Sequence, residues 1–255
     1  MSLASMLLLA AASAANEAPI CTDRPTKANA ICTVPKGSFQ LETSVLGWTL
    51  TKAGGTKTKA LSGGSSFLKY GLTDRSDLQL GFTPYVRIRN SGAIGDQSGV
   101  GDITVRYKHW LSTGESPVQV GLLPFVKIPI ARQGIGNRKL EGGLAVPISF
   151  GLGGSVTATL GPELDLIADG DKHGRHLGLV NLVNLSAPIA PRLTLIGELW
   201  SNLNFDPAGT IKQASADAAV AYALSPSTQL DMGVNAGLTP DTADVEVYAG
   251  VSLRF

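Results

Sequence analysis

The last thirteen residues, Ala243 to Phe255, read ADVEVYAGVSLRF, and their odd- and even-numbered positions differ in polarity. The odd-numbered positions are all apolar, whereas the even-numbered ones carry Asp244, Glu246 and Arg254. Alternation with a period of two indicates a strand with one apolar and one polar face. A soluble strand usually has about 5–6 residues, but a tilted membrane-spanning strand needs about 9–11. This stretch therefore predicts one strand of a closed barrel in a membrane.

The same alternation returns along the whole chain from Phe39 onward, which predicts an all-β fold of about twelve antiparallel strands. Short connections take turns with long polar ones, as periplasmic turns and outer loops do in outer-membrane barrels, so both termini are expected in the periplasm. The short turns recur about every 40 residues, a spacing also found in β-propellers, but a propeller blade needs four short strands where this chain has two long ones. The expected strands are Ser38–Lys52, Ala60–Leu72, Asp77–Asn90, Asp102–Leu111, Val118–Ala131, Glu141–Leu152, Val156–Asp169, His176–Ala187, Leu193–Phe205, Ala214–Leu224, Leu230–Leu238 and Asp244–Phe255.

Aromatic residues give a second pattern, because six of them lie beside short turns or chain ends and share the parity of the lipid-facing aliphatics. Such a ring is typical of the membrane interface. The terminal Phe255 also resembles the last residue of bacterial outer-membrane barrels, which the barrel assembly machinery reads. We therefore expect outer-membrane lipid and that machinery as partners. The six aromatics are Phe39, Tyr70, Tyr107, Phe150, Tyr222 and Phe255.

Composition and the N-terminal residues place the chain outside the cytoplasm. Charged residues make up 16% of the chain and the net charge is +1, so there is no basic stripe for nucleic acid. No apolar run reaches the roughly 18 residues of a transmembrane helix. Residues 1–15 have an apolar stretch followed by small residues, which predicts a cleaved export signal. Residues 16–37 are then expected as a periplasmic N-terminal segment and residues 38–255 as the barrel.

Cys21 and Cys32 are the two cysteines of the chain, and both lie in that N-terminal segment. An exported chain favours an oxidised pair, so we expect a disulfide between them. A metal site would need further ligands, and the segment contains no histidine. We expect neither a metal nor another cofactor.

Charged residues of both signs fall on the polar parity of the strands and are expected to line the lumen. Basic ones cluster on neighbouring strands and acidic ones on others, which predicts an electric field across the barrel. Two interpretations stay open: the charges filter solutes along a water-filled path, or they pair with one another and close it. The expected pore-lining residues are Lys69, Arg87, Arg89, Arg106, Lys108, Lys127, Glu163, Asp165, Glu198, Asp217 and Glu246.

A hydrolytic barrel is a further alternative, since some outer-membrane barrels are enzymes. The available bases are His109, His173 and His176, and no G-x-S-x-G motif occurs, so we expect no catalytic residues and no enzymatic activity. The run ADGDKHGRH at residues 168–176 predicts a solvated loop. A Ca²⁺ site at Asp169 and Asp171 is the alternative for that loop.

Six blocks of the sequence are distinctive, namely CTDRPTKANAICTVPKGSFQLE (21–42), KYGLTDRSDLQLGFTPY (69–85), GVGDITVRYK (99–108), EGGLAVPIS (141–149), GPELDLIADGDKHGRH (161–176) and GELWSNLNFDPAGT (197–210). They resemble the outer-membrane transporter family named after the meta pathway of phenol degradation. The resemblance covers nearly the whole mature chain, in the expected order. It implies an outer-membrane β-barrel in a Gram-negative bacterium that passes small solutes, aromatic or other small organic compounds, by diffusion. It brings no defined binding site.

Overall fold

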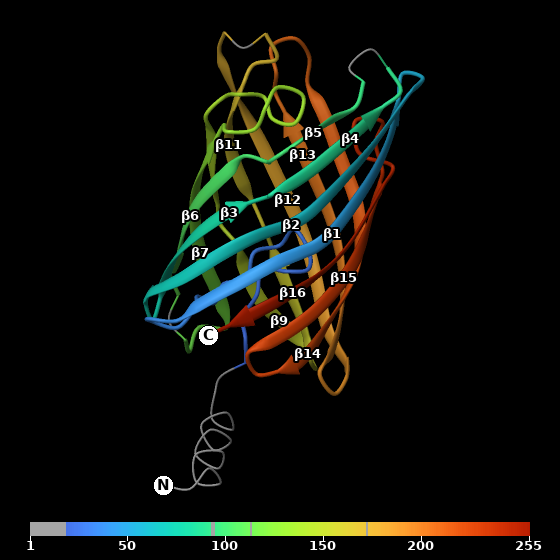
Figure 1. Ribbon diagram of the computed structural model, residues 1–255. Helices are drawn as coiled ribbons and strands as arrows, with labels where there is room; N and C mark the ends of the chain where they lie inside the picture. The colour runs from blue at the N-terminus through green and yellow to red at the C-terminus, as the bar shows by residue number, and fades with distance from the viewer. Residues whose placement is uncertain (1–18, 93–94, 113, 172) are drawn as a thin grey trace, which may run out of the picture.

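The computed structural model describes residues 19–92, 95–112, 114–171 and 173–255, and they form a closed antiparallel barrel (Figure 1). The expected export signal lies outside these residues. Closure comes from β1, which pairs with β2 on one side and with the last strand, β16, on the other. The strands are β1 (Phe39–Ala53), β2 (Thr56–Thr73), β3 (Ser76–Phe82), β4 (Tyr85–Asn90), β5 (Gln97–Gly99), β6 (Ile103–Trp110), β7 (Val118–Ile128), β8 (Glu141–Ala145), β9 (Ile148–Gly153), β10 (Val156–Leu160), β11 (Glu163–Ala168), β12 (Arg175–Ala190), β13 (Leu193–Asn204), β14 (Ile211–Ser225), β15 (Thr228–Gly237) and β16 (Val245–Arg254).

Twelve crossings of the wall make up the barrel, as the alternation predicted. Four crossings are each divided into two shorter strands: β3 with β4, β5 with β6, β8 with β9, and β10 with β11. Three of these interruptions contain a proline, namely Pro84, Pro147 and Pro162. Proline has no backbone N–H to give to a neighbouring strand, so the ladder breaks where it occurs.

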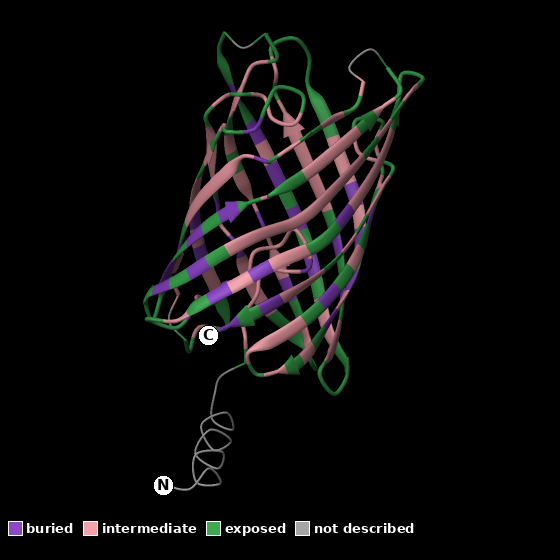
Figure 2. Cartoon of the chain, viewed as in Figure 1, coloured by how far each residue is buried: buried purple, intermediate pink, exposed green. Residues whose placement is uncertain are grey.

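Burial is inverted relative to a soluble protein. Large apolar side chains such as Leu199 and Met232 are about 60% exposed on the outside, whereas Lys69 and Lys108 are 2% and 1% exposed inside. Figure 2 shows the two classes alternating along the strands. An apolar outer surface with a polar interior is the arrangement of a membrane barrel.

In the described part of the chain, no helix is long and apolar enough to cross a membrane.

The rim that holds Phe255, expected on the periplasmic side, joins the two ends of the barrel sheet through aromatic residues. Phe39 lies 4.8 Å from Tyr70 and 6.1 Å from Phe255 between ring centroids. The backbones of Phe39 and Phe255 also exchange two hydrogen bonds of 2.8 and 2.9 Å. The final residue therefore completes the seam of the barrel.

Candidate functional site: a charged lumen and the segment that fills it

The N-terminal segment runs into the lumen, and the expected periplasmic position is corrected. We call residues 20–34 the lumenal segment. It enters where the Ile20 N–H donates to the carbonyl of Pro226, and it returns to the wall where the Val34 N–H donates to Asp77 Oδ2 at 2.9 Å. In Figure 1 it is the dark blue loop inside the barrel. The expected disulfide is present: Cys21 and Cys32 are bonded, with their Cα atoms 6.2 Å apart, and close the segment into a loop.

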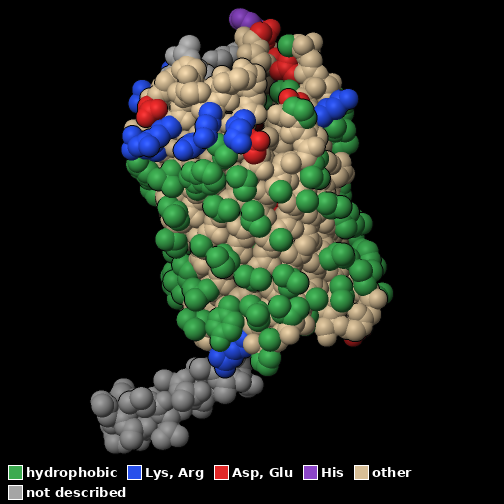
Figure 3. Space-filling view, turned by 90° about the vertical axis from the view of Figure 1, so that its right-hand side faces the viewer, with side chains coloured by type: hydrophobic (Ala, Val, Ile, Leu, Met, Phe, Trp, Pro, Cys, Tyr) green, Lys and Arg blue, Asp and Glu red, His purple; other side chains and the backbone are tan. Residues whose placement is uncertain are grey.

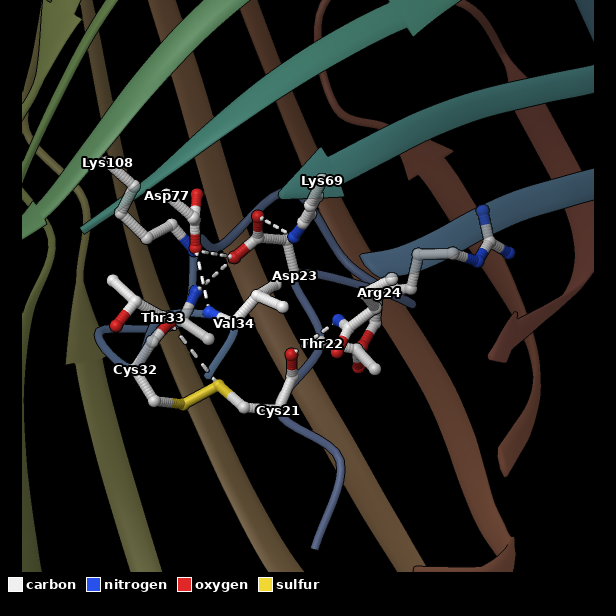
Figure 4. The surroundings of a disulfide bond; sticks show 12 residues. Cys21, Thr22, Asp23, Arg24, Cys32, Thr33, Val34, Lys69, Asp77 and Lys108 are labelled. Atoms are coloured by element: carbon white, nitrogen blue, oxygen red, sulfur yellow. Dashed lines mark hydrogen bonds and ion pairs between the residues drawn. A yellow bond between two sulfur atoms is a disulfide. The ribbon is translucent and has the colours of Figure 1, made fainter. Parts of the chain in front are cut away.

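Asp23 of the lumenal segment faces a wall of basic residues from β2 and β6 (Figure 4). Its two carboxylate oxygens accept hydrogen bonds of 2.5 Å from Lys69 and from Lys108. Lys69 also forms an ion pair with Glu42 at 2.5 Å. Burial on its own would raise the pKa of the Asp23 carboxyl, but Lys108 and Lys69 together hold that pKa well below its usual range. The two buried cations therefore favour the carboxylate form of Asp23.

Arg24 and Lys27 face the opposite, acidic wall. The Arg24 guanidinium binds both carboxylate oxygens of Asp231 on β15, at 2.5 and 3.1 Å. Lys27 forms an ion pair with Asp217 on β14. The backbone N–H groups of Lys27 and Ala28 each donate to Glu198 on β13 at 3.0 Å.

The order of charges along the lumenal segment thus matches the two walls. Its anion meets the basic wall and its two cations meet the acidic wall. The buried carboxylates of Glu42 and Asp77 lie beside Lys69 and Lys108, so the walls are not purely of one sign, and the lumenal segment lies between them. Sequence reasoning missed these three residues. The sequence did contain a signal for them: Asp23, Arg24 and Lys27 are charged residues of both signs, and they lie between the two cysteines next to a barrel of mixed charge.

The remaining inward charges mostly pair within the wall. Lys127 binds Glu141 at 2.6 Å and lies 3.5 Å from Asp102. Glu246 accepts a hydrogen bond of 2.9 Å from Asn235. Asp165 faces inward from β11, in the same direction as Glu163. These inward residues are spread over the height of the barrel, so the structure does not gather all the expected pore-lining residues into one constriction.

Arg87 and Arg89 do not face the lumen, which corrects their expected position. Residues directly opposite each other on paired strands share a face of the sheet. One such row runs from Val247 through Trp48 and Leu61 to Arg87, and Val247 is 41% exposed on the lipid side. The break at Pro84 is the reason, because a one-residue slip moves every later side chain to the other face.

A vestibule of about 380 Å³ lies above the lumenal segment, which forms part of its wall. Phe67, Leu182 and Trp200 line it together with Arg106 and Glu163. The Arg106 guanidinium stacks 4.0 Å over the Phe67 ring and donates to Asn29 of the lumenal segment at 3.3 Å. A cavity of 300–1,000 Å³ with apolar walls and a few polar groups is typical of a small-molecule site.

The histidines have structural partners. His176 Nδ1 lies 2.8 Å from Asp169 Oδ1, and His109 Nδ1 lies 3.2 Å from the Tyr107 hydroxyl. Asp171 accepts a hydrogen bond from the His173 N–H. Among the residues described by the structure, no three His, Cys, Asp or Glu side chains are grouped as metal ligands. The alternative of a Ca²⁺ site in this loop therefore gains no support.

Comparison with known proteins identifies the family. The family described as "Putative MetA-pathway of phenol degradation" matches residues 22–255. The chain belongs to this family. The match begins at Thr22, so it includes residues 22–34 of the lumenal segment as well as the barrel. A search of curated proteins finds no match.

Solved structures share the fold of this family member. An outer membrane channel from Pseudomonas putida F1 is 18% identical, with a TM-score of 0.74 over 88% of this chain and 98% of that one. The NanC porin is 9% identical, with a TM-score of 0.55 over 84% and 98%. The translocator domain of the autotransporter NalP from Neisseria meningitidis is 13% identical, with a TM-score of 0.54 over 87% and 90%. The fold is therefore that of the bacterial outer-membrane β-barrels.

Opening the disulfide is expected to loosen the lumenal segment. Closing a loop of this size restricts the free segment, and a loop of about 15 residues contributes about 3 kcal/mol in the chain-entropy model. We expect C21S/C32S to fold as a barrel but to show more frequent open events in planar bilayers. A trace indistinguishable from that of the wild type, with and without reductant, would show that the disulfide does not hold the segment.

Proposed function

We propose that this family member is an outer-membrane channel through which small organic solutes diffuse, and that the lumenal segment narrows its path. The observation that carries the proposal is the vestibule, which combines aromatic walls with charged groups of both signs, among them Arg106 and Glu163. The barrel supplies a sealed wall in the membrane, and the mixed charges of the lumen supply a filter. Diffusion needs no cofactor, and none is assigned.

The vestibule suits a planar molecule with a polar or charged end. Phe67 and Trp200 offer ring faces, and Leu182 adds apolar area. Arg106 lines the vestibule, so its guanidinium can donate a hydrogen bond to an oxygen of a passing solute. Small aromatic acids and phenols have this combination of ring and oxygen.

A barrel closed at rest is the second candidate, and one observation favours it. The lumenal segment binds both walls at once, so ion pairs obstruct the same space that a solute must cross. The open channel and the closed barrel differ in how often the lumenal segment leaves the solute path. An enzymatic barrel is the weakest candidate, since the structures similar in fold are named as a channel, a porin and a translocator domain.

Liposome swelling tests the channel proposal. Vesicles containing the purified chain are transferred into isotonic solutions of benzoate, phenol, glycine, glucose or sucrose. We expect the aromatic solutes to enter faster than sugars of larger size, with sucrose slowest. Swelling rates equal to those of empty vesicles for every solute would reject a channel open at rest and favour the closed barrel.

Phe255 is proposed to act in assembly, because it is an exposed aromatic carboxyl terminus at the seam. It is 71% exposed and stacks on Phe39. We expect Phe255→Ala to lower the amount of folded barrel in cellular outer membranes several-fold, measured as the heat-modifiable band on gels. Phe205→Ala, an exposed aromatic elsewhere on the chain, is the control. Equal amounts of Phe255→Ala and wild type would contradict this role.

A further inference from the structure

Five basic side chains form a patch on the outer wall of the barrel, away from the lumen. We call Lys52, Lys57, Lys59, Arg87 and Arg89 the outer basic patch. Lys52 lies opposite Lys57, and Lys59 lies opposite Arg89, so all face outward in the rows that also contain Leu50 and Leu61. Figure 3 shows basic side chains in a row directly above the apolar surface of the barrel. These five side chains lie outside the lumen and are separate from the charges that line it.

The patch lies at the height of the outer headgroups. Tyr70 marks the interface at the rim that holds Phe255, and Lys59 lies eleven residues before it along β2. At about 3.3 Å per residue and a tilt of about 45°, that length rises about 26 Å. The apolar band of an outer-membrane barrel is about 25 Å tall. The ammonium of Lys59 therefore emerges where acyl chains end and polar headgroups begin.

The positive charge of the patch is largely uncompensated. Asp96 is its acidic neighbour, at 3.7 Å from Arg87 and 3.8 Å from Arg89, and these side chains are 42–60% exposed. Ion pairs this long and exposed contribute little. Lys52, Lys57 and Lys59 have no ion-pair partner in the described ranges of the chain. Asp244 also lies at the edge of the patch, where it accepts a hydrogen bond of 2.6 Å from the Lys52 N–H, so an anion here would face five cations and two carboxylates.

A groove of about 290 Å³ joins the charges to the apolar belt. Lys59, Arg87 and Arg89 line one part of it, and Trp48, Leu61 and Tyr85 line the other. The groove is thus amphipathic in the direction of the membrane normal. A ligand that fits it needs an anionic head and an apolar tail, which a soluble anion lacks.

We propose that the outer basic patch binds the phosphorylated headgroup of an outer-leaflet lipid, with part of an acyl chain lying in the groove against Trp48 and Leu61. Arginine and lysine both bind phosphate, and arginine can do so with two parallel hydrogen bonds. The lipid A portion of lipopolysaccharide has both parts of this chemistry. The site faces lipid rather than the lumen, so it is independent of whether the channel conducts.

Native mass spectrometry of the intact chain in detergent tests the site. The probes are lipid A with its phosphates, the same lipid A after removal of its phosphates, and inorganic phosphate. We expect phosphorylated lipid A to bind, the dephosphorylated form to bind much more weakly, and inorganic phosphate not to compete. Each basic side chain near a membrane surface contributes about fivefold, so K59Q/R87Q/R89Q should bind phosphorylated lipid A about 100-fold more weakly.

The control K36Q/R192Q/K212Q removes the same amount of charge elsewhere and should bind like the wild type. A heat-modifiable band on gels equal to that of the wild type would show that K59Q/R87Q/R89Q is folded. Equal binding by K59Q/R87Q/R89Q and wild type would overturn the proposal. So would equal binding of the two lipid A forms, which would mean that acyl chains suffice, or competition by inorganic phosphate, which would mean a site for a soluble anion.

Discussion

Removing the three charges of the lumenal segment, in D23N/R24Q/K27Q, is expected to raise single-channel conductance several-fold. Each substitution breaks a contact to a wall: Asp23 to Lys69 and Lys108, Arg24 to Asp231, and Lys27 to Asp217. The wall charges that remain would be hydrated and would line an open path. Planar bilayer recordings give the conductance, and reversal potentials under a salt gradient give the selectivity.

The matched control is Lys212→Gln, which removes an outward charge on β14. It should leave conductance at the wild-type value. If D23N/R24Q/K27Q and Lys212→Gln both conduct like the wild type, the charges of the lumenal segment do not hold it in the path.

Removing the two buried cations around Asp23, in K69M/K108M, is expected to cost about 3–5 kcal/mol of barrel stability. Both side chains are almost fully buried, and breaking a buried ion pair leaves an uncompensated charge. Asp23 and Glu42 would then face an apolar wall. Urea unfolding followed by tryptophan fluorescence measures the loss.

A compensating variant separates this mechanism from simple loss of packing. K69M/K108M/D23N/E42Q removes the stranded carboxylates as well, and we expect it to recover most of the stability. Replacing a whole buried ion pair is often neutral, whereas removing one partner is not. A fourfold variant that is no more stable than K69M/K108M would mean that the lysine side chains act through packing rather than charge.

The barrel itself could be predicted from the sequence because each crossing repeats one simple physical rule. A wall with lipid on one side and a polar lumen on the other forces alternation, so Val247 and Leu253 of β16 alternate with Glu246 and Arg254. The aromatic rim followed as well, and Phe39, Tyr70 and Phe255 do meet there.

The site could be predicted only in part, for two physical reasons. The lumenal segment has no periodicity, so no pattern indicates on which side of the wall Asp23 or Lys27 lies; their positions follow from partners more than 40 residues away in sequence. The alternation of inward and outward residues also cannot be extrapolated across a break in a strand. Thr83 still faces inward beside Ser65, but Tyr85 after Pro84 is exposed, and the outward position of Arg87 and Arg89 follows from that slip.

The account has one central claim, namely that the lumenal segment lies between the charged walls in the membrane. Cross-linking tests it most directly. The Thr26 hydroxyl of the lumenal segment accepts a hydrogen bond of 2.9 Å from Asn184 on β12. The pair T26C/N184C is therefore expected to form a disulfide in isolated outer membranes, detected by peptide mass mapping, and its reduction should increase conductance fluctuations. The control T43C/S66C joins two neighbouring strands whose hydroxyls lie 2.9 Å apart. Cross-linking of the control pair without cross-linking of T26C/N184C would contradict the account.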